Sequence, residues 1–274
     1  MNIELIHNDS CNALNKLIEK GVLVDLIVTS PPYDNQRVYD ETVKWDFDTF
    51  KNIADQLYNI LKDGGVIVWI VGDATIKGSE TGTSFRQALY FKEIGFRLHD
   101  TMIYHKTSIT FPQWTRYYNS FEYMFILSKG KPKTVNLLAD RPNRQAGSKV
   151  SGGQRELNDT IKQKVGNREG RSIKEFGVRQ NVWTYDTGYN KSAKNKIAYQ
   201  HPAIAPLKLI EDHIKSWSNP NDTVLDCFMG SGTTGVACQN LNRNFIGIEL
   251  VEEYYDIARQ RLKDNNYKRL EDYG

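Results

Sequence analysis

The sequence has few cysteines and lacks any long apolar run. Its 274 residues include only Cys11, Cys227 and Cys238, and their spacing fits neither a metal site nor an even-numbered disulfide framework. We therefore expect reduced, buried thiols, as in a cytoplasmic protein. No stretch approaches the length of a membrane span, and the first residues lack the basic and apolar regions of a signal peptide. These absences predict a soluble protein without a membrane partner.

The net charge of +3 is small, but the positive charge is unevenly distributed. The segment 129–200 holds 16 Lys and Arg against 6 Asp and Glu, whereas the rest of the chain holds 20 against 27. Such a concentration of positive charge is typical of a surface that binds nucleic acid. The alternative is a solvated basic loop without a binding role.

Outside this segment, strand-like and helical stretches alternate. Apolar runs such as 66–72 are typical of parallel strands buried on both faces of a sheet. The expected strands are 3–9, 25–30, 66–72, 97–106, 121–128, 222–228 and 244–250. The expected helices are 10–21 with Ser10 as its cap, 47–65 closed by Gly64-Gly65, 83–94, 207–218, 233–241 and 252–265. This order predicts a seven-stranded, doubly wound, mostly parallel α/β sheet built from 1–128 and 201–274, with 129–200 inserted.

A glycine-rich loop follows the expected strand 222–228 and opens the next helix. Its residues 230–235 fit the pattern G-x-G-x-x-G, and Glu249 ends the following strand, 19 residues after Gly230. Glycines allow a tight turn and a close approach of a ligand, and an acidic strand end can accept hydrogen bonds from ribose hydroxyls. The loop therefore predicts a site for a nucleoside-containing cofactor. A glycine turn used only for packing is the alternative.

The same pattern occurs in nicotinamide-dependent oxidoreductases. Here, however, only one strand and one helix follow the loop, so no continuous dinucleotide-binding domain can be built after it. The sheet must take its other strands from the N-terminal half. We therefore expect strand 25–30 to lie beside 222–228, with 244–250 and then 3–9 on the other side, so that residue 30 faces the glycine loop across the switch point of the sheet.

Strand 25–30 runs directly into Ser30-Pro31-Pro32-Tyr33. Two prolines stiffen the backbone, so the Ser30 hydroxyl and a fixed carbonyl can accept hydrogen bonds from a planar amino group. The Tyr33 ring can stack on a flat base. Acceptors that hold the two N–H bonds of an exocyclic amine also stabilise the positive charge that develops on its nitrogen during attack. These residues favour methyl transfer from a sulfonium to an amino nitrogen.

The motifs TSPPY, DCFMGSGTTG, IGIEL and HPAIAPLKLIEDHI together resemble those of DNA amino-methyltransferases that use S-adenosylmethionine. Their order, with the tetrapeptide first and the glycine loop last, resembles the circularly permuted β-type of that family. The resemblance implies a catalytic role for Ser30, Pro31, Pro32 and Tyr33. It implies cofactor-binding roles for Asp9 near the adenine, for His201 and Pro202 near the methionine end, and for Asp226, Phe228, Gly230, Gly232, Thr234 and Glu249.

Two departures from the family pattern bear on this interpretation. Adenine-directed members usually begin the tetrapeptide with Asp, and Ser is commoner among members that methylate cytosine N4. We therefore expect cytosine N4 as the target, with adenine N6 as the alternative. Ala205 stands where many relatives carry Lys, which affects the expected contact with the cofactor carboxylate.

A target amino group inside a duplex cannot reach the cofactor, so such an enzyme flips its base out of double-stranded DNA. The resemblance makes 129–200 the target-recognition region, whose candidate DNA-binding residues are Arg141, Arg144, Arg155, Arg171 and Arg179. We expect Trp183, Tyr185 and Tyr189 to form a small core there. The aromatic stretch 114–120 is a candidate for strand contact, with packing as the equal alternative.

Partners beyond DNA follow from the resemblance alone. Relatives of this type often dimerise, and a restriction–modification setting would add a cognate restriction endonuclease. A non-catalytic DNA-binding protein that keeps the cofactor fold is the competing hypothesis. His105, Asp73 and Asp100 receive no role.

Overall fold

The computed structural model describes residues 1–33, 45–108, 114–149, 154–155, 161–162, 171–188, 196–201 and 204–272. The chain forms two compact units. The larger comprises Met1–Asn136 and Asn181–Gly274, and the smaller comprises Leu137–Gln180. The expected insert, 129–200, is thus wider than the compact unit that the structure shows.

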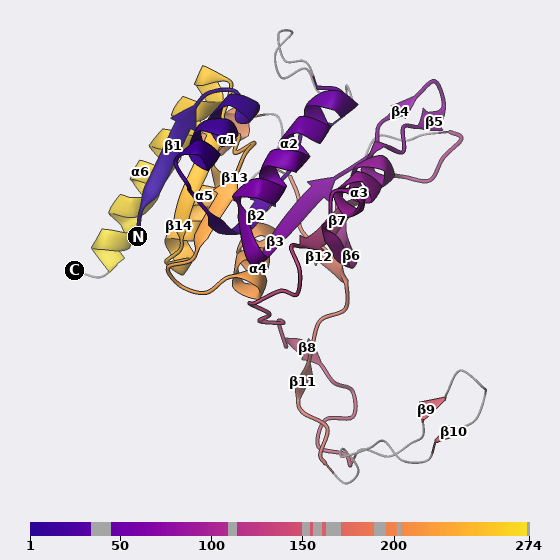
Figure 1. Cartoon of the computed structure of the whole chain (residues 1–274). Coiled ribbons are helices and arrows are strands. Elements are labelled where there is room, and N and C mark those ends of the chain that lie inside the picture. The colour runs from indigo at the N-terminus through magenta and orange to yellow at the C-terminus, as the bar shows by residue number, and fades with distance from the viewer. Residues whose placement is uncertain are drawn as a thin grey trace. The chain divides into compact units, whose positions relative to one another are not determined.

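The larger unit is built on an eight-stranded sheet (Figure 1). In spatial order its strands are β1 (Ile3–His7), β14 (Asn244–Glu249), β13 (Thr223–Asp226), β2 (Val24–Thr29), β3 (Leu61–Val71), β7 (Phe121–Ser128), β6 (Arg97–Lys106) and β12 (Val182–Tyr185). The pairings are parallel except for β7, which runs antiparallel to both of its neighbours. The mostly parallel α/β sheet is confirmed, and so is the expected order around β13.

The eighth strand comes from the segment that we expected to lie wholly outside the sheet. Strand β12 pairs with the end of β6, from Val182 opposite Ile103 to Tyr185 opposite Lys106. Trp183 is buried and stacks on His213 of helix α4 at a centroid distance of 4.7 Å. The expectation that Trp183 and Tyr185 form the core of a separate subdomain is therefore wrong, because both pack within the larger unit. Tyr189 lies outside the described residues.

Two groups of helices cover the sheet (Figure 1). Helices α1, α2 and α3 pack side by side, as do α4, α5 and α6. Their bounds are α1 (Ser10–Glu19), α2 (Phe47–Ile60), α3 (Thr83–Glu93), α4 (Leu207–Trp217), α5 (Thr233–Leu241) and α6 (Glu252–Asp272), with a 3-10 helix at Lys196–Gln200. None of the helices in the described part of the chain is long and apolar enough to cross a membrane.

Two helix ends differ from the expectation. The cap of α1 is Asp9, whose carboxylate accepts the Asn12 N–H at 3.0 Å, whereas the Ser10 hydroxyl donates to the Cys227 carbonyl at 2.6 Å. Helix α2 ends at Ile60 and not at Gly64-Gly65. Leu61 already has an extended backbone and pairs with Val24, so strand pairing overrides the helical pattern over 61–65.

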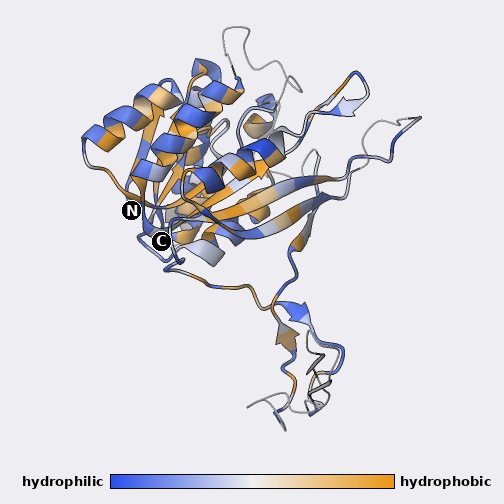
Figure 2. Ribbon diagram, turned by 45° about the vertical axis from the view of Figure 1, so that its right-hand side comes forward, coloured by the Kyte–Doolittle hydropathy of each residue, from blue (hydrophilic) through white to orange (hydrophobic). Residues whose placement is uncertain are grey.

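The core lies where β2 and β3 meet the helices, and Figure 2 shows the apolar colour concentrated along the strands of the central sheet. Phe50 and Phe91 pack edge to face on the Trp69 ring at centroid distances of 5.7 and 5.1 Å. The Trp69 indole N–H donates to the buried Gln87 side chain at 2.8 Å. Such fully buried aromatic packing, with its polar atom paired, stabilises the centre of the sheet.

The smaller unit contains two short antiparallel pairs, β8 (Arg141–Pro142) with β11 (Phe176–Gly177), and β9 (Gln154–Arg155) with β10 (Ile161–Lys162). In the larger unit, the residues on either side of this segment are held firmly. The Asn136 N–H donates to the Ser216 carbonyl at 2.8 Å, and the Asn181 side chain donates to the Thr101 carbonyl at 3.1 Å. A further hairpin of the larger unit pairs β4 (Thr75–Ile76) with β5 (Ser79–Glu80).

Candidate active site

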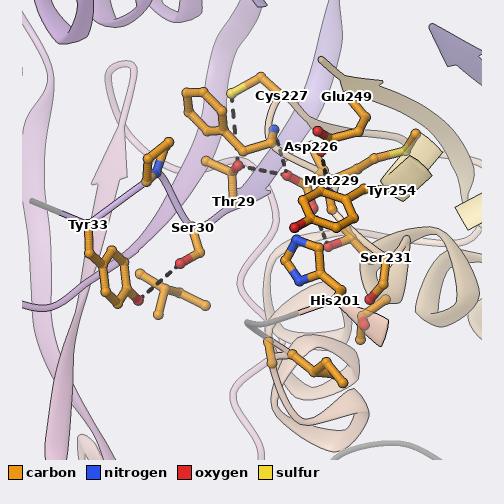
Figure 3. A pocket seen from close by; sticks show the side chains of 18 of the residues that line it. Thr29, Ser30, Tyr33, His201, Asp226, Cys227, Met229, Ser231, Glu249 and Tyr254 are labelled. Atoms are coloured by element: carbon orange, nitrogen blue, oxygen red, sulfur yellow. Dashed lines mark hydrogen bonds between the residues drawn. The ribbon is translucent and has the colours of Figure 1, made fainter. Parts of the chain in front are cut away.

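A cavity of about 610 Å³ opens at the carboxyl ends of the parallel strands of the larger unit. The segments that follow β1, β2, β13 and β14 all contribute to its wall, together with the facing ends of β6 and β7. Strands β13 and β2 run parallel, but the chain leads from β13 to β14 on one side and from β2 to β3 on the other, and open α/β sheets bind ligands at such a switch point. Figure 3 shows Ser30 and Tyr33 on one side of this cavity and His201, Glu249 and Tyr254 on the other.

The glycine loop is shaped by two left-handed glycines. Gly230 has φ +49° and Gly232, the cap of α5, has φ +77°. A Cβ at Gly230 would lie 2.9 Å from the His201 ring, and one at Gly232 would lie 2.9 Å from the Cβ of Ala258 on α6. Gly230 and the His201 ring both line the cavity, whereas Gly232 lets the loop pack on α6. The two glycines therefore serve different purposes.

Glu249 at the end of β14 braces this loop. Its carboxylate accepts the Gly230 N–H and the Val251 N–H, each at 2.9 Å. Burial raises the pKa of the Glu249 carboxyl, although these backbone N–H groups act in the opposite direction. Because Glu249 also lines the cavity, lone pairs beyond those two bonds can meet the hydroxyl groups of a ligand.

Asp226 joins three elements beneath the cavity. Its carboxylate accepts the hydroxyls of Thr29 and Thr234 at 2.7 and 2.6 Å, and the Phe228 N–H at 3.1 Å. The side chain is buried, and desolvation raises its pKa although all three hydrogen bonds lower it. Asp226 thus ties β13 to β2 and to α5. The Thr234 hydroxyl donates its proton within this network and not to a ligand. The Phe228 ring packs edge to face on Trp45 at a centroid distance of 5.4 Å.

We expect Asp226→Asn to change how stability depends on pH. A raised pKa in the folded state gives a stabilisation that is complete below the ordinary Asp pKa and is lost as pH rises through the raised one. The free energy of unfolding of the unmodified protein should therefore fall over that window, and Asn should remove this part of the fall. Asp226→Ala removes the same titration, and at low pH, where Asp226 is protonated, it should also cost about 3 kcal/mol, because it strands two hydroxyls and an N–H. Urea unfolding across a pH series measures both, and identical pH slopes in the Asn variant and the unmodified protein would contradict the prediction.

The tetrapeptide after β2 has its hydroxyls linked in a chain. The Ser30 Oγ and Tyr33 Oη atoms lie 3.0 Å apart, and the Tyr33 hydroxyl donates to Glu122 Oε2 at 3.0 Å. Glu122 Oε1 in turn accepts from Lys106 Nζ at 2.5 Å. Ser30, Pro32, Tyr33, Lys106 and Glu122 all line the cavity, whereas Pro31 is buried.

Sequence reasoning did not single out Lys106 or Glu122. Lys106 ends β6 and Glu122 lies near the start of β7, so the antiparallel pairing brings both to the edge where the parallel strands end. The signal was available only through the sheet order, because neither residue belongs to a motif on which the interpretation rested. His105, the residue before Lys106, is not among the residues that line the cavity, and its Nδ1 atom lies 3.2 Å from the Thr184 hydroxyl.

Most of the expected cofactor residues meet at this cavity. Asp9, His201, Asp226, Phe228, Gly230, Thr234 and Glu249 line it, as does Ala205. The His201 ring lies edge to face on Tyr254 at a centroid distance of 4.4 Å, so these two rings form one wall. Pro202 lies outside the described residues. Among those described, no three His, Cys, Asp or Glu side chains gather closely enough to hold a metal ion.

The expected DNA-binding arginines lie in the smaller unit. Arg179 forms an ion pair with Asp140, with Nε at 2.7 Å from Oδ1, and Arg141 Nε donates to the Val178 carbonyl at 3.1 Å. These two are therefore engaged within the unit. Arg144 and Arg171 are exposed, and the side chain of Arg155 is outside the described part.

The aromatic stretch between β6 and β7 is exposed. Trp114 and Tyr117 are 98% and 101% exposed, so the packing alternative is wrong for these two rings. Arg116 between them donates to the Gly78 carbonyl and pairs with Glu80 at 3.5 Å, which fixes the stretch to the β4–β5 hairpin. Exposed aromatic rings are suited to stacking on bases, so strand contact stays a prediction.

A doubly wound sheet that places a glycine loop and a Ser-Pro-Pro-Tyr turn on either side of its switch point defines a class, the α/β methyltransferases. The sequence as a whole identifies the family within this class. This chain belongs to the N6_N4_Mtase family of DNA methylases, whose model matches residues 24–260.

Individual relatives agree with this assignment. The orphan methyltransferase M.BamHII of Bacillus amyloliquefaciens is 56% identical over 257 residues, which cover 92% of this chain and 94% of that protein. Two solved structures share the fold. The M1.HpyAVI–SAM complex has a TM-score of 0.64 at 24% identity, covering 95% of this chain and 99% of the other. The PvuII DNA methyltransferase (cytosine-N4-specific) has a TM-score of 0.66 at 19% identity, covering 97% and 91%.

Proposed function

We propose that this protein transfers a methyl group from S-adenosylmethionine to the exocyclic amino group of a base flipped out of double-stranded DNA. The preferred target is cytosine N4, and adenine N6 is the alternative. One observation carries the proposal, namely that the Ser30 hydroxyl and the glycine loop face a single cavity of about 610 Å³. That volume lies within the range of sites for cofactor-sized ligands.

The cavity residues fit the proposed cofactor. Gly230 has no Cβ where the loop meets the cavity, and Glu249 presents a carboxylate beside it, so a ribose can approach the backbone closely. Phe228 and Tyr254 supply flat apolar surface for an adenine ring. When bound, S-adenosylmethionine supplies an electrophilic methyl group on a sulfonium. His201, Ile204 and Ala205 line the cavity, and we place the methionine end on their side.

The tetrapeptide acts on the other substrate. Ser30 Oγ and the carbonyl groups of the proline pair accept the two N–H bonds of the target amine, which favours a localised lone pair on its nitrogen. Tyr33, whose ring lies over Gly72, is placed to stack on the base. No strong base is needed before transfer, since the proton leaves after the nitrogen has become positively charged.

The remaining roles follow the family pattern. The order of the motifs supports a β-type permuted enzyme, with the segment 129–200 reading the recognition sequence and the exposed arginines Arg144 and Arg171 contacting DNA phosphates. We propose that it acts without a cognate endonuclease, since M.BamHII is named an orphan methyltransferase. This departs from the restriction–modification setting expected above. A homodimer remains part of the proposal.

The decisive experiment is nucleoside analysis by mass spectrometry after incubation with S-adenosylmethionine and unmethylated mixed-sequence DNA. N4-methylcytosine is the expected product and would support the weight placed on Ser30. N6-methyladenine would keep the mechanism and overturn the base. No methylated base, from a preparation that binds the cofactor, would favour a non-catalytic DNA-binding protein.

A further inference from the structure

Lys106 and Glu122 form an ion pair inside the wall of the cavity. The side chains of Lys106 and Glu122 are 25% and 15% exposed, and the Nζ–Oε1 distance is 2.5 Å. Among the described residues that line the cavity, Lys106 is the only lysine or arginine. An ion pair so placed costs desolvation free energy, so a role in recognition is a better explanation for it than stability.

The pair fixes the direction of the hydrogen bonds that end at Ser30. An ionised Glu122 can only accept, so the Tyr33 hydroxyl must donate to it. The Tyr33 oxygen is then the acceptor for the Ser30 hydroxyl, 3.0 Å away. The Ser30 proton is therefore directed at the Tyr33 oxygen, and the Ser30 oxygen can offer its lone pairs to a ligand. Ser30 becomes an acceptor because Glu122 is a carboxylate.

The other end of the pair is a donor. The Lys106 ammonium has three N–H bonds, and in the described part of the chain Glu122 is the only group that accepts one of them. Among the described residues the other two N–H bonds have no hydrogen-bond acceptor, the nearest aromatic ring being that of Tyr104 at 5.8 Å, and Lys106 lines the same cavity as Ser30. The wall thus offers an acceptor at Ser30 and a charged donor at Lys106, joined through Tyr33 and Glu122.

This pattern distinguishes the two candidate bases. The hydrogen-bonding edge of cytosine has an amino group at one end and the carbonyl oxygen O2 at the other, whereas the same edge of adenine ends in a C2–H group. A charged donor that meets a C–H group is left unpaired, which costs more than a good hydrogen bond gains. We propose that Lys106, held by Glu122, donates to O2 of the flipped base while Ser30 accepts from its amino group, so that this ion pair makes the site selective for cytosine. The inference rests on the proposed methyl transfer and assigns its specificity to two residues.

The test pairs a protein change with a change in the base. Lys106→Met removes the donor, and the double variant Lys106→Met/Glu122→Gln also avoids an unpaired carboxylate while keeping an acceptor for Tyr33. Lys62→Met is the matched control, since Lys62 is also ion-paired, with Asp25 at 2.7 Å, but does not line the cavity. The substrates are two synthetic duplexes of the site found by nucleoside analysis and sequencing, one with cytosine and one with 2-thiocytosine, whose sulfur is a poor acceptor.

We expect kcat/KM of the unmodified protein and of Lys62→Met to fall about 10-fold or more from cytosine to 2-thiocytosine, the effect of losing one charged hydrogen bond. Lys106→Met and the double variant should lose a similar factor on cytosine and show almost no further loss on 2-thiocytosine. Their affinity for S-adenosylmethionine should stay within about 2-fold of the unmodified protein, which also reports that they fold.

The outcomes separate this inference from the proposed function. No methylated base from the unmodified protein overturns the function itself, and N6-methyladenine overturns the choice of cytosine together with the role of Lys106. Suppose instead that N4-methylcytosine forms and that kcat/KM falls by the same factor from cytosine to 2-thiocytosine in the unmodified protein and in every variant. That result would overturn the role of Lys106 alone, because the ammonium would then not contact O2.

Discussion

Ser30→Ala should reduce methyl transfer by about 100-fold or more while leaving cofactor affinity nearly unchanged. The variant removes the oxygen that accepts an amino N–H where positive charge develops, and groups of this kind contribute about 2.7–4 kcal/mol to the transition state. Ser30 lies on the tetrapeptide side of the cavity, away from the Glu249 carboxylate that braces the glycine loop. The rate in single-turnover assays and cofactor affinity by calorimetry check the two halves of the prediction.

Tyr33 variants divide the same prediction into its parts. Tyr33→Phe keeps the ring but breaks the link between Ser30 and Glu122, so that the Ser30 hydroxyl can turn its proton into the cavity. Tyr33→Ala also removes the stacking surface and should reduce methyl transfer more than Tyr33→Phe does. Ser79→Ala, at an exposed hydroxyl in the β4–β5 hairpin, is the matched control for Ser30→Ala and should be fully active. Near-native turnover of Tyr33→Ala would show that stacking on this ring is not used.

Gly232→Ala should destabilise the folded protein by about 3 kcal/mol. At φ +77° an alanine is strained by about 1–2 kcal/mol, and its Cβ would lie 2.9 Å from Ala258 Cβ and 3.1 Å from Ala258 Cα, which adds the cost of overpacking. The contacted atoms of α6 are the Cβ and Cα of Ala258, which no change of rotamer can move, so the clash cannot be relieved in that way. Denaturant unfolding gives the free energy directly.

Gly21→Ala separates the two contributions. Gly21 has φ +71°, almost the same conformation, but nothing lies within 4 Å of a Cβ built there. It should therefore show the backbone strain alone, about 1–2 kcal/mol. If both variants lost the same free energy, close packing of the glycine loop on α6 would not be what requires glycine at position 232.

The order of the central strands followed from the sequence because the glycine loop lies so close to the C-terminal end. With one strand after it, β13 had to find its other neighbours in the N-terminal half, and β2 was the apolar run available. The same argument placed Ser30 opposite the loop. What failed were features set by tertiary contacts, such as β12, whose four residues carry too short a pattern to indicate a strand.

The roles of individual side chains were less accessible. Asp226 matches the family motif, but its carboxylate accepts hydrogen bonds from Thr29, Thr234 and the Phe228 N–H. It therefore supports the site through contacts with other protein groups. Lys106 and Glu122 are separated by 15 residues and become neighbours only through the antiparallel pairing of β6 and β7. A one-dimensional pattern shows motifs, whereas a charge pair across strands depends on register.

The two asparagines that flank the smaller unit have a consequence for how such a protein can evolve. The chain leaves the larger unit after Asn136, whose N–H donates to Ser216 of α4, and re-enters it at Asn181, whose side chain donates to Thr101 of β6. Everything between is one continuous cassette whose internal contacts are its own. Recombination within those two anchors can therefore exchange residues 137–180 in one event, which under the proposed function would change the recognition sequence and leave the methyl-transfer site as it is.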